Sequence, residues 1–462
     1  MKMRTEQKTA VKNSIGRLVF VALSVLLQVI WICVQAMKLN RYSTWISVAT
    51  SVLTLVVVIL LYGRRTNAAF KMPWIILILA FPVLGLGMYL LFGRKEATQL
   101  VRERFERIDQ SLDGLLIQDK AVRIKLQQTD RMAANEAEYI WNYAKYPIYQ
   151  NTDVVFYKEA SEGIEAQKQA LNQAKHFIFM EYHAIEDKQS FGELKEILAR
   201  KAKEGVEVRL FYDDIGSIGF INTDFIQRME AEGIQCRVFN RLMPVLNVFM
   251  NNRDHRKITV IDGKIGFTGG YNLADEYFNI THPYGYWKDT GVRLEGDAVR
   301  SLTVMFLEMW NAIKGTDTDY TPYFLQDGAQ PHEAGLAGSV GVTQSDANIA
   351  ADSASGFVQP YADSPLDGEP VGENVYMGVV KAASEYVYFT TPYLIISDEM
   401  SRELCLAAKR GVDVRIVTPG IPDKKLVYRV TRSYYAQLAS AGVRIFEYTP
   451  GFLHAKQCVS DD

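Results

Sequence analysis

Hydrophobic positions divide the chain into an apolar first hundred residues and a longer part in which apolar and polar residues alternate. Three long apolar runs lie in the first part, at 18–34, 45–62 and 74–92. Each is about as long as a helix that crosses ~30 Å of hydrocarbon at ~1.5 Å per residue. The pattern therefore predicts a membrane anchor at 1–95 with two to three transmembrane segments.

The first run could also be a signal peptide, because basic residues precede it. No small-residue cleavage site follows it, so an uncleaved anchor is favoured. The four cysteines show neither CxxC nor zinc-like spacing, which is typical of isolated reduced thiols. We therefore expect a multi-pass protein of the cell membrane whose remaining part lies in the cytoplasm.

Beyond the anchor, residues 96–150 are rich in charge and carry apolar side chains at helical spacing, which predicts a charged helical connector. From 152 onward, strand and helix patterns alternate. Buried strands are predicted at 177–180 and 206–211, with a helix at 192–203 between them. This alternation indicates an α/β fold with mixed or parallel sheets flanked by helices. Residues 327–356, rich in Gly, Ala, Ser and Asp, read as a flexible linker.

The part after this linker repeats the part before it. AKEGVEVRLFYD at 202–213 matches AKRGVDVRIVTP at 408–419, and FIFMEYHAI at 177–185 corresponds to VYFTTPYLI at 387–395. The repeat predicts two lobes, at 151–326 and 357–462, related by a pseudo-two-fold axis.

Each lobe carries one copy of the pattern His-x-Lys-x-x-x-x-Asp. The first copy is His255, Lys257 and Asp262, and the second is His454, Lys456 and Asp461. Residues two apart in an extended strand face the same side, so each histidine should point with its lysine. Asp262 and the glycine after it, between alternating apolar residues, predict a hairpin turn. Lobes related by a two-fold axis would bring both copies to one site.

Such a site suits a phosphate group. One neutral histidine can attack phosphorus, and the other can protonate the leaving oxygen and later deprotonate an acceptor alcohol. The lysines stabilise developing charge, while Gly269, Gly270 and Asn272 could bind the phosphate. Glu181 could orient a histidine, although a structural glutamate is an equal alternative. No cluster with ligand spacing demands a metal, and no cofactor is expected.

Charge and composition narrow the class of substrate. The formal net charge is −2, and no concentrated basic patch is evident in the sequence. Nucleic acid is therefore not an expected partner, because affinity for it depends on clustered cations. The apolar runs instead place the site beside lipid headgroups, so a lipid phosphodiester and the bilayer itself are the expected partners.

These residues resemble the phospholipase D superfamily and, within it, the bacterial cardiolipin synthases. The likeness covers the anchor and nearly all of the remaining chain. Its most specific pieces are NRDHRKITVIDGKIGFTGGYNLADEY (252–277), YDDIGS (212–217), YWKDTGVRLEGDAV (286–299), TTPYLI (390–395) and GFLHAK (451–456).

The resemblance implies transfer of a phosphatidyl group from one phosphatidylglycerol to another through a phosphohistidine, giving cardiolipin and glycerol. It places both motif copies in the catalytic set, with Gly269, Gly270 and Asn272 completing the first. It also implies a further strand with a Gly-Thr/Ser-x-Asn segment after Asp461, which this sequence lacks, so the second lobe is expected to be incomplete. The alternatives are a phospholipase D-type hydrolase and an inactive truncated relative. The oligomeric state stays open.

Overall fold

The structure, a computed structural model, describes residues 23, 26–32, 43–64, 68–93, 99–241, 253–324, 356–364 and 368–461. Most of the linker predicted at 327–356, and part of the apolar run at 18–34, lie outside these residues. The chain forms two compact units. One comprises residues 1–103 and 241–252, and the other comprises 104–240 and 253–462.

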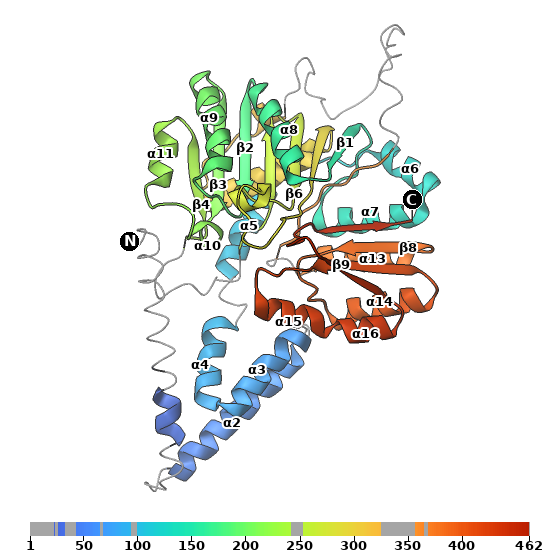
Figure 1. Ribbon diagram of the computed structural model, residues 1–462. Coiled ribbons are helices and arrows are strands. Elements are labelled where there is room, and N and C mark those ends of the chain that lie inside the picture. The colour runs from blue at the N-terminus through green and yellow to red at the C-terminus, as the bar shows by residue number, and fades with distance from the viewer. Residues whose placement is uncertain are drawn as a thin grey trace. The chain divides into compact units, whose positions relative to one another are not determined.

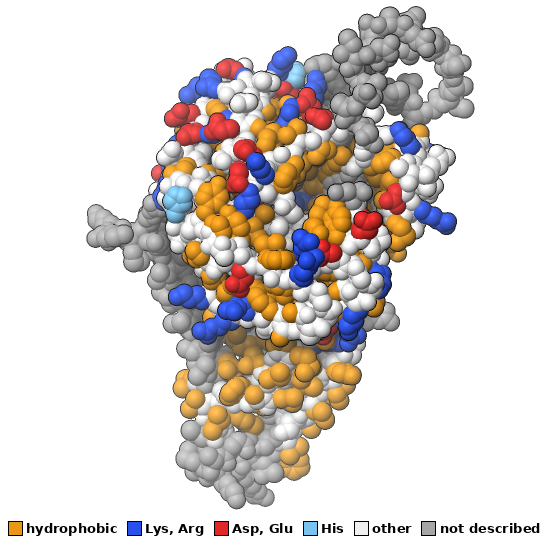
Figure 2. Space-filling view, turned by 45° about the vertical axis from the view of Figure 1, so that its right-hand side comes forward, with side chains coloured by type: hydrophobic (Ala, Val, Ile, Leu, Met, Phe, Trp, Pro, Cys, Tyr) orange, Lys and Arg blue, Asp and Glu red, His pale blue; other side chains and the backbone are white. Residues whose placement is uncertain are grey.

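Apolar helices make up the described part of the first unit: α2 (Ser43–Gly63), α3 (Ala68–Ala80) and α4 (Pro82–Phe92) (Figure 1). The third apolar run is broken at Phe81, because Pro82 has no N–H to continue α3 and instead begins α4. Figure 2 shows hydrophobic side chains gathered on the outside of this unit. Among the described residues, no helix is both long and apolar enough to cross a membrane, so the predicted multi-pass anchor is not confirmed.

Three helices form the charged connector: α5 (Gln99–Leu112), α6 (Lys120–Thr129) and α7 (Arg131–Ala144). Aspartates cap the last two. Asp119 accepts the N–H of Ala121, and Asp130 accepts those of Met132 and Ala133. These side chains satisfy N–H groups that have no partner inside the helix, which fixes where each helix begins.

A seven-stranded mixed sheet forms the first lobe, in the order β1-β7-β6-β5-β2-β3-β4. Strands β2, β3 and β4 are parallel, and the other neighbours are antiparallel. The predicted strands and helix are confirmed with slightly different ends. The strands are β1 (Thr152–Tyr157), β2 (Phe177–Tyr182), β3 (Glu207–Asp213), β4 (Gln235–Phe239), β5 (Lys257–Ile261), β6 (Ile265–Gly269) and β7 (Gly291–Gly296).

Helices cover both faces of this sheet (Figure 1). Ile178 and Met180 of β2 pack with α8 (Ala160–Asn172), α9 (Gln189–Lys203) and α11 (Phe225–Ala231). Phe179, which points the other way, packs with α12 (Val299–Ile313). Because it is covered on both faces, β2 is buried along its whole length and begins with the apolar run at 177–180. Short helices α10 (Asp214–Ser217), η2 (Asp275–Phe278) and η3 (Thr321–Tyr323) complete the lobe.

The second lobe repeats this connectivity in a four-stranded sheet of order β10-β9-β8-β11. Strands β8 (Tyr386–Thr390), β9 (Asp413–Pro419) and β10 (Arg444–Tyr448) are parallel, as β2, β3 and β4 are. Strand β11 (Gln457–Ser460) runs antiparallel to β8, as β5 does to β2. The helices are α13 (Val371–Ala382), α14 (Asp398–Lys409), α15 (Lys425–Ser433) and α16 (Tyr435–Ser440). The repeated sequence therefore folds into a repeated structure.

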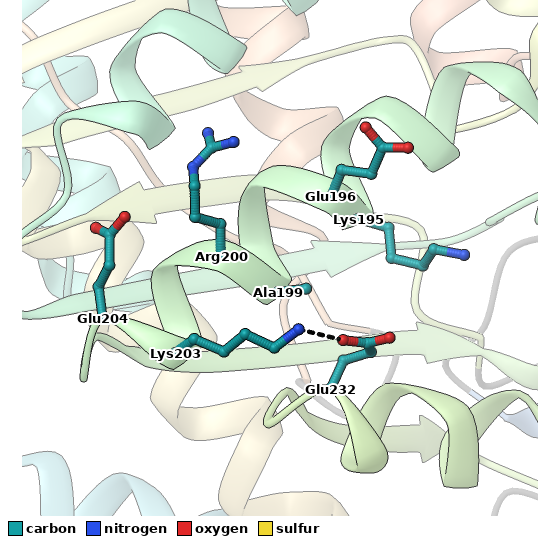
Figure 3. Close-up of a pocket in the computed structure, with 7 residues that line it drawn as sticks. All are labelled: Lys195, Glu196, Ala199, Arg200, Lys203, Glu204 and Glu232. Atoms are coloured by element: carbon teal, nitrogen blue, oxygen red, sulfur yellow. Dashed lines mark hydrogen bonds and ion pairs between the residues drawn. The ribbon is translucent and has the colours of Figure 1, made fainter.

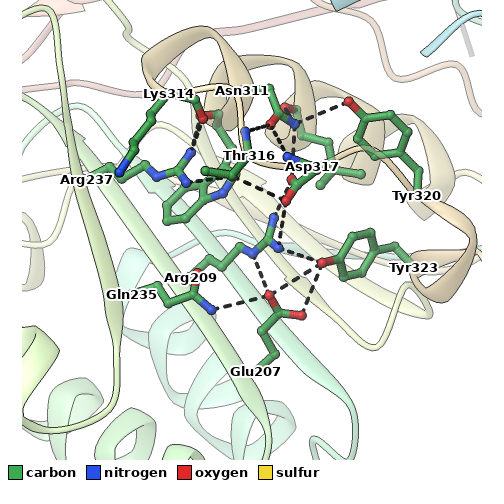
Figure 4. A network of polar contacts seen from close by, with 12 residues as sticks. Glu207, Arg209, Gln235, Arg237, Asn311, Lys314, Thr316, Asp317, Tyr320 and Tyr323 are labelled. Carbon is green, nitrogen blue, oxygen red and sulfur yellow. Dashed lines mark hydrogen bonds and ion pairs between the residues drawn. The ribbon is translucent and has the colours of Figure 1, made fainter. Parts of the chain in front are cut away.

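A buried polar network holds the amino-terminal end of β3 (Figure 4). Arg209 donates to both oxygens of Asp317, at 2.7 and 3.1 Å, and to the hydroxyl of Tyr323 at 2.6 Å. Its guanidinium lies 5.2 Å from the ring centroid of Trp310. Both motif histidines lie elsewhere, beyond the opposite ends of the parallel strands, so we read this network as structural.

Candidate active site

His255 and Lys257 lie on one side of the backbone that leads into β5. The Lys257 ammonium is 3.3 Å from Nδ1 of His255 and donates to the His255 carbonyl at 2.6 Å. Lys257 is buried, and it is the first residue of the strand. The prediction that this histidine and lysine point together is confirmed.

The second copy has the same local geometry before β11. The Lys456 ammonium is 3.0 Å from Nδ1 of His454 and donates to the His454 carbonyl at 2.6 Å. Two segments about two hundred residues apart thus present an imidazole and an ammonium in the same way, as their sequence match predicts.

Backbone hydrogen bonds fasten the second copy to the first lobe. The N–H of Lys288 donates to the carbonyl of Phe452 at 2.9 Å, and the N–H of His454 donates to the carbonyl of Lys288 at 2.8 Å. Phe452 is buried and packs against Trp287, with ring centroids 4.8 Å apart. The lobes therefore meet beside His454. The second motif copy lies close enough to the first to lower the pKa values of His255 and Lys257.

Asp289, from the first lobe, is the hydrogen-bond partner of His454 in the second. Its Oδ2 lies 2.6 Å from Nδ1 of His454, and both side chains are buried. The nearby His454 and Lys456 hold the pKa of Asp289 below its usual range in spite of its burial. A carboxylate in this position fixes the ring and stabilises the imidazolium form. Reasoning from the sequence missed this role, although WKDTG lies within one of the pieces that carry the resemblance.

The pKa values of both motif histidines and both motif lysines are lowered. Burial and the neighbouring Lys257 lower the pKa of His255 to about 2. For His454, burial and Lys456 lower the pKa to about 4, against the opposing effect of Asp289. The pKa of Lys257 falls to about 7, through burial and Lys456, and that of Lys456 to about 8, through burial. An anion among these groups would relieve the repulsion, which suits a phosphodiester.

Glu181 pairs with an arginine and not with a histidine. Its Oε1 accepts from Nε of Arg256 at 2.6 Å, and its side chain is fully buried. Burial raises its pKa well above the usual value, and the neighbouring Asp254 adds to this effect. In the structure the partner of Glu181 is therefore Arg256, and the predicted contact with a histidine is not observed.

The predicted phosphate-binding residues have other contacts here. A Cβ at Gly270 would lie 1.9 Å from Oδ1 of Asp289, so only glycine leaves room for that carboxylate. At Gly269 a Cβ would lie 2.6 Å from the carbonyl oxygen of Thr290. Asn272 is buried, accepts the N–H of Ala184 at 3.2 Å and donates to the hydroxyl of Tyr277 at 2.8 Å.

Both motif aspartates bind backbone N–H groups at the start of a neighbouring strand. Asp262 accepts from the N–H groups of 175, 176 and 177, each at 2.8 Å, just where β2 begins. Asp461 accepts from those of 384, 385 and 386 at 2.6 to 3.0 Å, where β8 begins. Within the described chain, neither carboxylate has a hydrogen bond or ion pair with a motif histidine or lysine. The structure thus gives these residues the same bracing contact in each lobe.

A third histidine, His183, lies beside His255, with ring centroids 4.6 Å apart. Its Nδ1 is 2.6 Å from the carbonyl oxygen of Asp254, so this nitrogen carries the proton. Across the described ranges, no group of three or more His, Cys, Asp or Glu residues is arranged to hold a metal ion.

Comparisons with known proteins match the chain over most of its length. The family model "Cardiolipin synthase, PLD-like domain" matches residues 168–310 and 376–462, and "Phospholipase_D-nuclease N-terminal" matches 50–94. A protein of Streptococcus mutans, named only as uncharacterized, is 39% identical and covers 88% of this chain and 83% of its own. Cardiolipin synthases of Halalkalibacterium halodurans and Alkalihalophilus pseudofirmus are 32% and 30% identical, each over 90% of this chain and 80% and 79% of their own.

Proposed function

The chain belongs to the bacterial cardiolipin synthases of the phospholipase D superfamily, and on this premise we propose that it joins two phosphatidylglycerol molecules into cardiolipin and glycerol. One observation carries the proposal. Two His–Lys pairs share one site, and of the two motif histidines only His454 has a carboxylate partner among the described residues. The two histidines are therefore different in kind, as a nucleophile and a proton carrier need to be.

We assign the nucleophile to His255. Its lowered pKa keeps the ring neutral, with a nitrogen lone pair available to attack phosphorus. A new N–P bond forms as the P–O bond to the glycerol headgroup breaks, leaving a phosphatidyl group on the histidine. Lys257 and Lys456 lie where they can stabilise the charge on the phosphoryl oxygens.

His454 is the proton carrier in this scheme. Asp289 stabilises its imidazolium form, and the negative phosphodiester adds to that stabilisation once it is bound. His454 gives its proton to the departing glycerol oxygen and then accepts the proton of the second phosphatidylglycerol's hydroxyl. That oxygen attacks phosphorus, the N–P bond breaks, and His255 is released unchanged.

The motif aspartates act differently from their expected catalytic role in this proposal. We propose that Asp262 and Asp461 brace the strand that carries each His–Lys pair, because their oxygens are occupied by backbone N–H groups. Gly270 leaves room for Asp289, and Asn272 joins the segment that follows β2 to η2. Direct binding of phosphate by Gly269, Gly270 and Asn272 stays a prediction.

Attachment to a bilayer would favour transfer of the phosphatidyl group to an alcohol over its transfer to water. The helices α2 to α4 expose large apolar side chains such as Leu53, Leu60 and Ile76, a surface that suits lipid. We propose that the chain is anchored there, with its second unit in the cytoplasm. Both lipid substrates would then be concentrated beside the site.

The test is to give the full chain vesicles of phosphatidylglycerol without nucleotide. We expect cardiolipin and glycerol in equal amounts. Phosphatidic acid as the sole product would replace the proposal with a phospholipase D-type hydrolase, and no product from a folded chain would favour an inactive relative.

Labelled phosphatidylglycerol tests the assignment of the nucleophile. We expect a covalent adduct on the peptide that contains His255, and its loss in His255→Asn. An adduct that survives this substitution would move the nucleophile to His454.

A further inference from the structure

Helix α15 carries two of its apolar side chains outward. A helix that packs on a core normally turns its apolar positions inward. In α15 the buried residue is Thr431, whose hydroxyl accepts the N–H of Leu394 at 3.1 Å. Leu426 and Val430, four residues apart and on one face, are 75% and 44% exposed. The exposed apolar row is therefore not explained by packing within the second lobe.

A row of cations lies beside this apolar row. Lys425 and Arg429 each precede an exposed apolar residue by one position, so they form a parallel row on the helix surface. Within the part of the chain that the structure describes, neither side chain has a hydrogen bond or ion pair. The helix, KLVYRVTRS, contains no acidic residue.

The surface cations of α9 differ from these. Figure 3 shows a surface pocket lined by Lys195, Arg200 and Lys203 together with three glutamates. Lys203 pairs with Glu232 at 3.0 Å. Positive charge is therefore offset along α9, and at the far end of α15 Arg432 pairs with Glu447 at 3.8 Å. Lys425 and Arg429, beside the exposed apolar row, are left without such a pair among the described residues, which distinguishes this face of α15 as a surface for an anionic partner.

The segment that leads into α15 lies beside the active site. The N–H of Ile421 donates to the carbonyl of Gly451 at 3.1 Å, three residues before His454. Asp423 accepts from the hydroxyl of Tyr393 and acts electrostatically on Lys456. A partner bound to α15 would therefore lie next to the part of the active site that contains His454.

We propose that α15 is the surface through which the catalytic unit rests on a bilayer of anionic phospholipid. Leu426 and Val430 enter the interface, while Lys425 and Arg429 pair with lipid phosphates. Adjacent apolar and basic rows on one helix fit a membrane surface, and clustered Lys and Arg are attracted to anionic lipid. The choice of a bilayer as the partner rests on the proposed function and on the apolar surface of α2 to α4.

Hydrogen exchange of the full chain in nanodiscs tests the contact without any substitution. In phosphatidylglycerol discs the amides of 425–433 should exchange at least about five times more slowly than in phosphatidylcholine discs. The reason is that each cation near an anionic surface strengthens binding to it by a factor of about five. High salt should remove the difference, and α11 should show none. Equal rates in both discs would overturn the proposal. Protection that grows with protein concentration in either lipid would overturn it in favour of a second copy of the chain.

A double variant, Lys425→Glu with Arg429→Glu, tests the consequence for turnover. We expect the half-saturating fraction of phosphatidylglycerol in vesicles to rise about tenfold or more, with turnover of a monomeric short-chain phosphatidylglycerol unchanged. The matched control, Arg200→Glu with Lys203→Glu on α9, should leave both unchanged. Equal loss on both substrate forms would overturn the docking role. If the unaltered chain has no transferase activity, the proposed function fails, and the exchange comparison alone decides this inference.

Discussion

Asp289 distinguishes the two histidines of the site more than any other residue. Its carboxylate is buried 2.6 Å from Nδ1 of His454, whereas the described residues give His255 no such partner. We expect Asp289→Asn to lower kcat by about 10²- to 10⁴-fold, because the amide cannot stabilise the imidazolium and favours the wrong tautomer. The adduct on His255 should still be detectable. An unchanged kcat would remove Asp289 from the proton-transfer step.

The pH dependence of kcat/KM should follow the two motif lysines. Their pKa values in the free protein are lowered to about 7 and about 8, so each is a cation below its pKa and neutral above it. Phosphodiester binding needs the cations, and the first step needs a proton on His454. The rate at low substrate should therefore fall as pH rises. It falls gradually above about 4, as His454 loses its proton in the free protein, and more steeply through about 7 and 8, as the lysines become neutral. A flat profile from pH 6 to 9 would contradict this reading.

At the scale of elements, the turn between β5 and β6 joins two strands and braces a third. Asp262 and Gly263 have φ of 53° and 64°, the left-handed pair that a tight hairpin requires, and the Asp262 side chain caps the start of β2. We expect Asp262→Ala to lower the melting temperature by about 2–8 °C, through loss of three hydrogen bonds and strain at a positive φ. Asp262→Asn tolerates this φ and is the matched control. Turnover per folded molecule should change little in either variant.

The Arg209 network should contribute to stability and not to chemistry. Arg209 and Asp317 are both largely buried, and removing one member leaves the other charge unpaired. We expect Arg209→Met to cost about 3–5 kcal/mol of unfolding free energy. Lys203→Met, which breaks an exposed pair on α9, should cost about 0–1 kcal/mol. Chemical denaturation of the two variants gives the comparison, and similar losses would contradict the assignment.

Local patterns predicted the elements well and the contacts between distant segments poorly. The apolar run of β2, the Asp262-Gly263 hairpin and the pointing of each lysine with its histidine all follow from nearby residues. The sequence also offered Glu181 as a residue that could orient a histidine, whereas its observed partner is Arg256. Asp289 lies 165 residues from His454 in sequence, so their contact becomes visible only once the lobes are docked.

At the scale of the whole molecule, the junction of the lobes decides activity. Phe452 is buried against Trp287 at this junction, and backbone hydrogen bonds on either side align His454 with Asp289. Phe452→Ala should cost about 3–5 kcal/mol and should lower kcat by misplacing His454. Phe306→Ala, deep in the first lobe, is a control of similar expected cost whose surviving folded fraction should retain kcat. Equal kcat in the two folded variants would argue against a catalytic role for the junction.

The carboxylate that contacts His454 of the second lobe comes from Asp289 of the first lobe. Neither lobe therefore contains the whole site by itself. In the proposed mechanism, a partly assembled chain would hold a nucleophile without its proton carrier, or a proton carrier without its carboxylate, and would therefore have little activity on the lipids around it.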